Sequence, residues 1–163
     1  MKKHGFTIIE LLVTISIMGA LSSLVLTGVS KGRAKAYDAK RIADLHTILT
    51  GYLLYNSNGG GTLTNYGCNG SCQTSDTNPN FLSELISDGT FINVPKATHN
   101  DAANPYMYYD YGSGNPYGFM VVTELEASPA SLGYPDSCRP FHAVNNWCRD
   151  DLASNDYCLC FPY

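Results

Sequence analysis

The first part of the chain is apolar over the width of a membrane. From Phe6 to Val25 the sequence contains one charged residue, Glu10, and Lys2 and Lys3 precede this run. A helix of about 20 residues, at about 1.5 Å per residue, crosses the roughly 30 Å hydrocarbon core of a bilayer. The pattern therefore predicts a membrane-spanning helix. A carboxylate inside such a span is costly without a partner, so Glu10 is a candidate functional residue.

The helical pattern continues beyond this span. Apolar residues recur at helical spacing on one face, namely Ile42, Leu45, Ile48, Leu49, Tyr52 and Tyr55. Polar residues occupy the opposite face, namely Lys40, Asp44, Thr47 and Thr50, and we expect that face to stay in water. No proline interrupts residues 6–57, and the run Asn56–Gly61 ends the pattern. The sequence thus predicts one helix of about 50 residues, about 75–80 Å long.

The second half of the chain predicts a short helix and a small sheet. A brief helix is expected at Phe81–Ile86, and a short strand is one option at Thr62–Thr64. Tyr106–Tyr111 and Tyr117–Leu125 flank a five-residue Gly/Asn/Pro link, which is a hairpin signal. Asp156–Phe161 is the expected third strand. A long helix laid across an antiparallel sheet buries both apolar faces, so the predicted fold class is α+β.

Charge is distributed unevenly along the 163 residues. Five basic residues follow the apolar run, namely Lys31, Arg33, Lys35, Lys40 and Arg41. Beyond position 41, three basic residues stand against twelve acidic ones, a net charge of −9. This acidic part of the chain, which forms the expected globular head, repels phosphate backbones, so nucleic acid is not expected as its partner. The basic cluster is the only candidate site for anionic lipid or DNA, and a solvated helix face accounts for it.

Six cysteines follow the long helix: Cys68, Cys72, Cys138, Cys148, Cys158 and Cys160. An even number indicates disulfides where the location is oxidising, although the sequence does not select the pairing. Cys68 and Cys72 can close a small local loop. Cys158 and Cys160 alternate along a strand, so they share a face and are not expected to bond each other. Cys138 and Cys148 are their candidate partners. A zinc site that includes His142 is the alternative, although its spacing fits no standard motif.

The string Gly5-Phe6-Thr7-Ile8-Ile9-Glu10-Leu11-Leu12-Val13 separates three explanations of the apolar run. A secretory signal has a shorter apolar stretch followed by a small-residue cleavage site. A plain membrane anchor does not account for Glu10 or for the Gly-Phe junction. The string resembles the processing signal of type IV pilins and type II secretion pseudopilins. Phe91–Lys96, followed by Asn104-Pro105-Tyr106, is similar to the approach to the sheet in the major pseudopilin.

This resemblance implies a pilin-like fold and cleavage between Gly5 and Phe6 by a membrane prepilin peptidase. It implies N-methylation of Phe6, and it assigns Glu10 to assembly, paired with the Phe6 ammonium of a neighbouring subunit. A buried charge without its partner costs several kcal/mol, so this pairing fixes the axial register. The implied partners are copies of the same subunit, the peptidase, an inner-membrane assembly platform, minor pilins and, before assembly, membrane lipid. The implied location is the inner membrane as a single-pass protein with the head outside the cytoplasm, then a surface pilus or periplasmic pseudopilus.

The segment Ala127–Asn155 is rich in Pro, Ser, Asp and Asn and precedes the last expected strand. Four side chains at the end of this segment and directly after it offer oxygen ligands to calcium, namely Asp150, Asp151, Asn155 and Asp156. Major pseudopilins carry a calcium site at a comparable position, so the resemblance makes calcium a candidate, although the ligand pattern is not matched. A solvated acidic loop stabilised by disulfides is the alternative, and no other cofactor is expected.

The sequence contains no Gly-rich phosphate loop, G-x-S-x-G elbow or H-E-x-x-H motif, so an enzyme is not expected. The expected organisation is a leader at 1–5, a transmembrane and polymerisation half-helix at 6–30, an amphipathic half-helix at 31–58 and a globular head at 59–163. The expected function is a structural subunit of a pilus or pseudopilus filament. The alternatives are a minor pilin-like subunit whose head binds DNA, surfaces or secreted substrate, and a single-span membrane protein that never polymerises.

Overall fold

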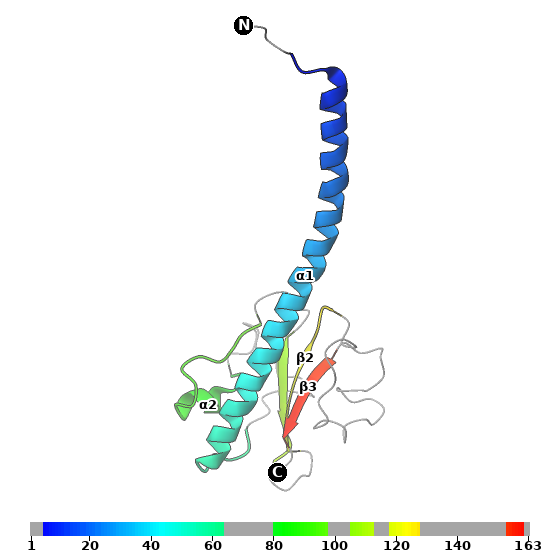
Figure 1. Cartoon of the computed structure of the whole chain (residues 1–163). Helices are drawn as coiled ribbons and strands as arrows, with labels where there is room; N and C mark the ends of the chain where they lie inside the picture. The colour runs from blue at the N-terminus through cyan, green and yellow to red at the C-terminus, as the bar shows by residue number, and fades with distance from the viewer. Residues whose placement is uncertain (1–4, 64–79, 98–104, 113–117, 128–155, 162–163) are drawn as a thin grey trace.

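In the computed structural model of the chain, a long helix projects from a small head (Figure 1). The structure describes residues 5–63, 80–97, 105–112, 118–127 and 156–161. Along the chain these contain helices α1 (Ile8–Ser57) and α2 (Ser83–Ser87) and strands β1 (Tyr106–Asp110), β2 (Phe119–Glu124) and β3 (Asp156–Phe161). Helix α1 lies across one face of the sheet, so the expected α+β fold is confirmed.

Helix α1 runs without a break for 50 residues, as the sequence pattern predicts. At its start Thr7 is the N-cap, and Thr7 and Glu10 form a reciprocal capping box. At its end Asn58 is the C-cap, and Gly59 follows with φ at +88°, a conformation that favours glycine. The polar, glycine-rich run after the helix therefore ends it where the sequence indicates.

The strands form one antiparallel sheet in the order β1-β2-β3. In its register Tyr108 lies opposite Val121, and Val121 lies opposite Leu159. β1 and β2 thus form the expected hairpin, and β3 has the predicted bounds. β1 ends at Asp110 rather than Tyr111, and β2 lies within the predicted range 117–125.

Helix α2 starts later than the sequence suggests. Its first residue is Ser83 rather than Phe81, because Leu82 adopts a left-handed backbone conformation with φ at +51°. Leu82 and Leu85 are fully buried, so this short helix anchors the segment after α1 to the head.

The core lies between α1 and the facing side of the sheet. The rings of Tyr52 and Phe119 stack with centroids 3.9 Å apart, and Phe81 meets Tyr108 edge-on at 5.3 Å. Burying a side chain of this size contributes about 1.5–3 kcal/mol relative to leaving it exposed. The buried cluster also contains Leu45, Ile48, Leu63, Leu82, Leu85, Ala97, Tyr106, Val121, Leu125, Tyr157 and Leu159.

The opposite side of the sheet buries a second cluster, formed by Met120, Val122, Cys158 and Cys160. The two cysteines share this face, as their alternation along the strand predicts. Neither is a free thiol, because both are disulfide-bonded. The other four cysteines lie outside the described residues, so the pairing stays a prediction.

The face of α1 that contacts the head is rotated relative to the face that hydropathy selects. Its buried residues are Asp38, Arg41, Leu45, Ile48, Gly51 and Tyr52, whereas Ile42 and Leu49 are only partly buried. The assignment of Arg41 to a solvated helix face is wrong, because its guanidinium is buried in the head and forms ion pairs with Asp38 and Glu126. Asp44, also expected in water, is partly buried and accepts a 2.7 Å hydrogen bond from the Tyr106 hydroxyl.

Candidate functional site

The N-terminal tip exposes the peptide bond between Gly5 and Phe6. Neither residue belongs to α1, and Phe6 is 83% exposed. A Cβ added at Gly5 would meet no heavy atom within 4 Å. No packing has to be broken for a protease to reach this bond, so the geometry permits cleavage there.

The Glu10 carboxylate is held by the residue that caps α1. Its Oε2 accepts hydrogen bonds from the Thr7 backbone N–H at 2.9 Å and from the Thr7 hydroxyl at 2.7 Å. The N-terminus of the helix dipole also favours a negative charge at this position. Within the described part of the chain, Oε1 accepts no hydrogen bond and Glu10 forms no ion pair. One carboxylate oxygen can therefore accept a donor from another molecule.

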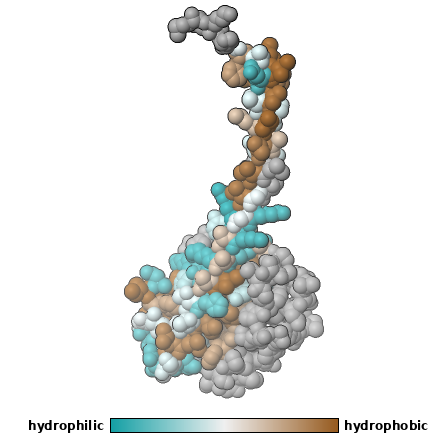
Figure 2. Space-filling model, in the orientation of Figure 1, coloured by the Kyte–Doolittle hydropathy of each residue, from teal (hydrophilic) through white to brown (hydrophobic). Residues whose placement is uncertain are grey.

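The N-terminal half of α1 is not covered by any other described part of the protein. Its most apolar 18-residue window is 0% buried, and by length and composition the helix can cross a membrane. Figure 2 shows apolar side chains along the projecting part of the helix. The exposed large side chains are Ile8, Ile9, Leu11, Leu12, Val13, Ile15, Ile17, Met18, Leu21, Val25 and Val29, which we call the apolar stem. Because apolar residues cover the helix on several sides, such a stem is stable only in lipid or in a bundle of similar helices.

Hydroxyl groups within the stem are satisfied by their own helix. The hydroxyls of Thr14, Ser16, Ser22 and Ser23 donate to backbone carbonyls three or four residues earlier, at 2.7–2.8 Å. These bonds remove the cost of placing the hydroxyls in an apolar environment. A hydropathy scale scores these four residues as polar. The sequence alone therefore underestimates how apolar the surface of the stem is.

A buried ion-pair network joins the stem to the head. Asp38 Oδ1 accepts from Arg41 Nη1 at 2.9 Å and from the Glu126 backbone N–H at 2.9 Å. Asp38 Oδ2 accepts from the Ala127 N–H at 2.7 Å, and Arg41 Nη2 lies 2.7 Å from Glu126 Oε1. The side chains of Asp38 and Arg41 are 0% and 2% exposed. The network ties the end of the β2 segment to the helix where the helix enters the head.

A second buried carboxylate, Asp110, joins three segments of the head. Its Oδ2 accepts from Tyr52 Oη at 3.1 Å and from the Leu63 N–H at 2.7 Å, and its Oδ1 accepts from the Gly112 N–H at 2.9 Å. Burial raises the pKa of Asp110, and the two backbone donors partly oppose that rise. Thr62 and Leu63 do not form the strand considered at Thr62–Thr64, and Thr64 lies outside the described residues. The Leu63 N–H bonds Asp110 instead.

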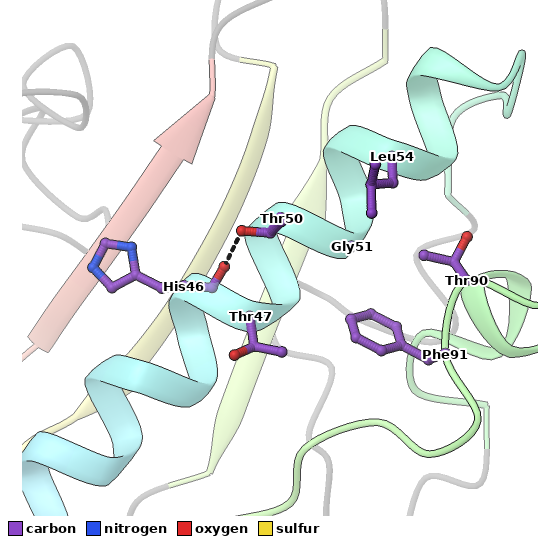
Figure 3. A pocket seen from close by; sticks show the side chains of 7 residues that line it. All are labelled: His46, Thr47, Thr50, Gly51, Leu54, Thr90 and Phe91. Carbon is purple, nitrogen blue, oxygen red and sulfur yellow. Dashed lines mark hydrogen bonds between the residues drawn. The ribbon is translucent and has the colours of Figure 1, made fainter.

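An open depression of about 380 Å³ lies beside α1 in the head (Figure 3). Its lining consists of His46, Thr47, Thr50, Gly51, Leu54, Thr90 and Phe91. The Phe91 ring lies against Gly51, and the His46 imidazole points away from that ring (Figure 3). The Thr50 hydroxyl is bonded to the His46 carbonyl oxygen at 2.8 Å. We therefore interpret this depression as the edge of a packing contact between α1 and the segment that follows α2.

The candidate calcium site falls mostly outside the described residues. Asp156 is the first residue of β3, whereas Asp150, Asp151 and Asn155 are not described. Among the described residues, no group of three His, Cys, Asp or Glu side chains is arranged to hold a metal ion. Calcium stays a prediction, and the same holds for zinc at His142, which also lies outside these residues.

A family model described as the prokaryotic N-terminal methylation motif matches residues 1–26. This motif is the signal of type IV pilins and pseudopilins, and in this chain a long N-terminal helix follows it. The resemblance of the string at residues 5–13 is thereby confirmed. No curated protein and no solved structure matches the chain significantly.

Proposed function

We propose that this chain, which carries the N-terminal methylation signal of type IV pilins and pseudopilins, is a structural subunit of a pilus or pseudopilus filament. The observation that carries the proposal is the bare apolar stem, which continues as one rigid helix into a folded head. A stem of this kind has two stable environments, lipid before assembly and the stems of neighbouring subunits afterwards.

The first step of the proposal is removal of the leader. Prepilin peptidase cleaves between Gly5 and Phe6, and the new α-amino group of Phe6 is then methylated. The exposure of this bond and its place outside the helix support the step. Cleavage removes Lys2 and Lys3, so the processed tip keeps the terminal ammonium as its cation.

The second step pairs Glu10 with that ammonium on a neighbouring subunit. Oε2 is occupied by Thr7 in the isolated chain, and Oε1 is the oxygen that the proposal assigns to the neighbour. A charge buried among apolar stems without its partner costs several kcal/mol, so only one axial register is favourable. The pair therefore sets position along the filament, while stem burial supplies cohesion.

The proposal places the chain in the inner membrane before assembly, with the head outside the cytoplasm. Its partners are then membrane lipid, the prepilin peptidase and the assembly platform, followed by minor pilins and further copies of the chain. The apolar stem and its position near the N-terminus support this placement.

The test is a pair of valine substitutions in the stem. Glu10→Val removes the register-setting carboxylate, and we expect sheared filaments to be lost while membrane insertion is retained. Ser16→Val is the matched control, because the Ser16 hydroxyl bonds only its own helix at Leu12 among the described residues. Normal filaments from Glu10→Val would contradict the proposal.

A second candidate is a minor subunit whose head binds DNA, a surface or a secreted substrate. Exposed apolar side chains on the head favour it, namely Leu54, Ile86 and Ile92, the last of which is 91% exposed. Apolar groups of this kind suit a protein surface better than DNA, since the head is acidic. Quantifying the subunit in sheared filaments separates the two functions, because a minor subunit is present in few copies.

A further inference from the structure

The basic residues that follow the stem fall into two groups. Lys40 pairs with Asp44 at 3.1 Å, and Arg41 pairs with Asp38 and Glu126 inside the head. Lys31, Arg33 and Lys35 are exposed, and within the described part of the chain none of them forms an ion pair or a side-chain hydrogen bond. We call these three residues the basic collar.

The collar lies at the boundary between the apolar stem and the head. From Ile8 to Val29 the helix rises about 33 Å, which matches a hydrocarbon core of about 30 Å. Lys31 lies two residues after Val29, and hydrophilic side chains project at the junction of stem and head (Figure 2). When the stem spans a bilayer, the collar is therefore level with the phosphate groups of one leaflet.

No acidic residue offsets the collar along the helix. The sequence has none between Glu10 and Asp38, and Asp38 is buried and bonded to Arg41 and to two backbone N–H groups. The three positive charges therefore act together on whatever surrounds the helix at this level.

The collar surrounds the helix rather than forming a stripe. At about 100° per residue, Lys31 and Lys35 lie on nearly the same side, and Arg33 lies roughly opposite them. A protein partner that contacts one side of the helix cannot reach all three side chains. A layer of lipid headgroups surrounds the helix on all sides and can.

We propose that Lys31, Arg33 and Lys35 bind the phosphates of anionic phospholipids in the leaflet next to the head, and so fix the depth of the stem before assembly. This inference rests on the membrane stage of the proposed function. Each base that reaches the phosphates of an anionic leaflet strengthens lipid association by at most roughly fivefold.

The test measures lipid selectivity of the full chain reconstituted in phosphatidylcholine vesicles. Trace spin-labelled phosphatidylglycerol or spin-labelled phosphatidylcholine is added, and the motionally restricted fraction is read by electron spin resonance. We expect a severalfold preference for phosphatidylglycerol that declines with added salt. The triple variant Lys31→Gln, Arg33→Gln, Lys35→Gln should lose that preference. Lys40→Gln is the matched control and should keep it, because Lys40 is paired with Asp44 above the collar.

Two results would overturn the inference, namely equal association of the two lipids with the wild-type chain and a triple variant that keeps its lipid preference. If the triple variant keeps the lipid preference but no longer assembles, the collar binds the acidic head of a second copy rather than lipid. Failure of the wild-type chain to float with vesicles contradicts the membrane stage itself, whereas insertion without lipid preference overturns only the role of the collar.

Discussion

The guanidinium of Arg41 and the carboxylate of Asp38 form a buried ion pair one helical turn apart, with Nη1 2.9 Å from Oδ1. Asp38 also accepts the backbone N–H groups of Glu126 and Ala127, so a single carboxylate joins α1 to the end of the β2 segment. The network therefore ties the end of the β2 segment to α1 where the helix enters the head.

Substituting Asp38→Ala should destabilise the head strongly. The change leaves the Arg41 guanidinium without this buried partner and leaves two backbone donors unsatisfied, and we expect a loss of about 3–5 kcal/mol in the free energy of unfolding. Urea unfolding of the full chain in detergent, followed by near-ultraviolet circular dichroism, measures it. Lys40→Ala removes a surface pair and is the control, with an expected loss of about 0–1 kcal/mol. Equal losses in the two variants would refute the role of the network.

Gly51 is required where the Phe91 ring meets the helix backbone. A Cβ at this position would overlap the ring, so Gly51→Ala should cost about 1–3 kcal/mol, partly offset by better helix propensity. In a Phe91→Leu background the overlap is relieved, and the same substitution should become neutral or stabilising. A double-mutant cycle by urea unfolding measures the coupling. A cycle that shows no coupling would contradict the close contact.

Asp110 should make the head less stable as pH rises out of the acid range. Burial raises the pKa of Asp110 in the folded chain above the ordinary value of 3.8, so the folded state holds this proton more tightly than the unfolded state. Its contribution is complete below pH 3.8 and is lost as pH rises through the folded pKa. Asp110→Asn removes this dependence, although it also loses one acceptor for the surrounding donors. The free energy of unfolding of the wild type, minus that of Asp110→Asn, should therefore fall as pH rises through that window. A difference that does not change with pH would contradict the raised pKa.

Cys158 and Cys160 should each be joined to a cysteine elsewhere in the chain rather than to each other. Both side chains point from β3 to the same buried face of the sheet, and both are disulfide-bonded. Peptide mapping without reductant should recover links from this strand to Cys138 and Cys148. A peptide in which Cys158 is bonded to Cys160 would disprove the pairing.

The sequence predicts the parts of this fold that depend on local pattern. The glycine run after Ser57, the hairpin and the alternation in β3 each depend on residues close together in the chain, and the structure has all three. The N-terminal signal is equally local, so a short string indicates it.

The parts that the sequence does not predict depend on partners distant in the chain. Arg41 is buried because Glu126, 85 positions later, lies beside it, and hydropathy assigns an arginine to water. Asp110 is buried because Tyr52 and Leu63 supply donors from other segments. Gly51 shows its role only once Phe91 is placed against it. In each case a polar or small residue is buried by a contact that no local pattern encodes.

The most direct test of the account is mass spectrometry of the mature N-terminus of the chain from cells that assemble filaments. Cleavage and methylation predict a chain that begins at an N-methylated Phe6 and lacks residues 1–5. A cellular protein that still begins with Met1-Lys2-Lys3 would contradict the claim that the apolar stem is a processed polymerisation helix.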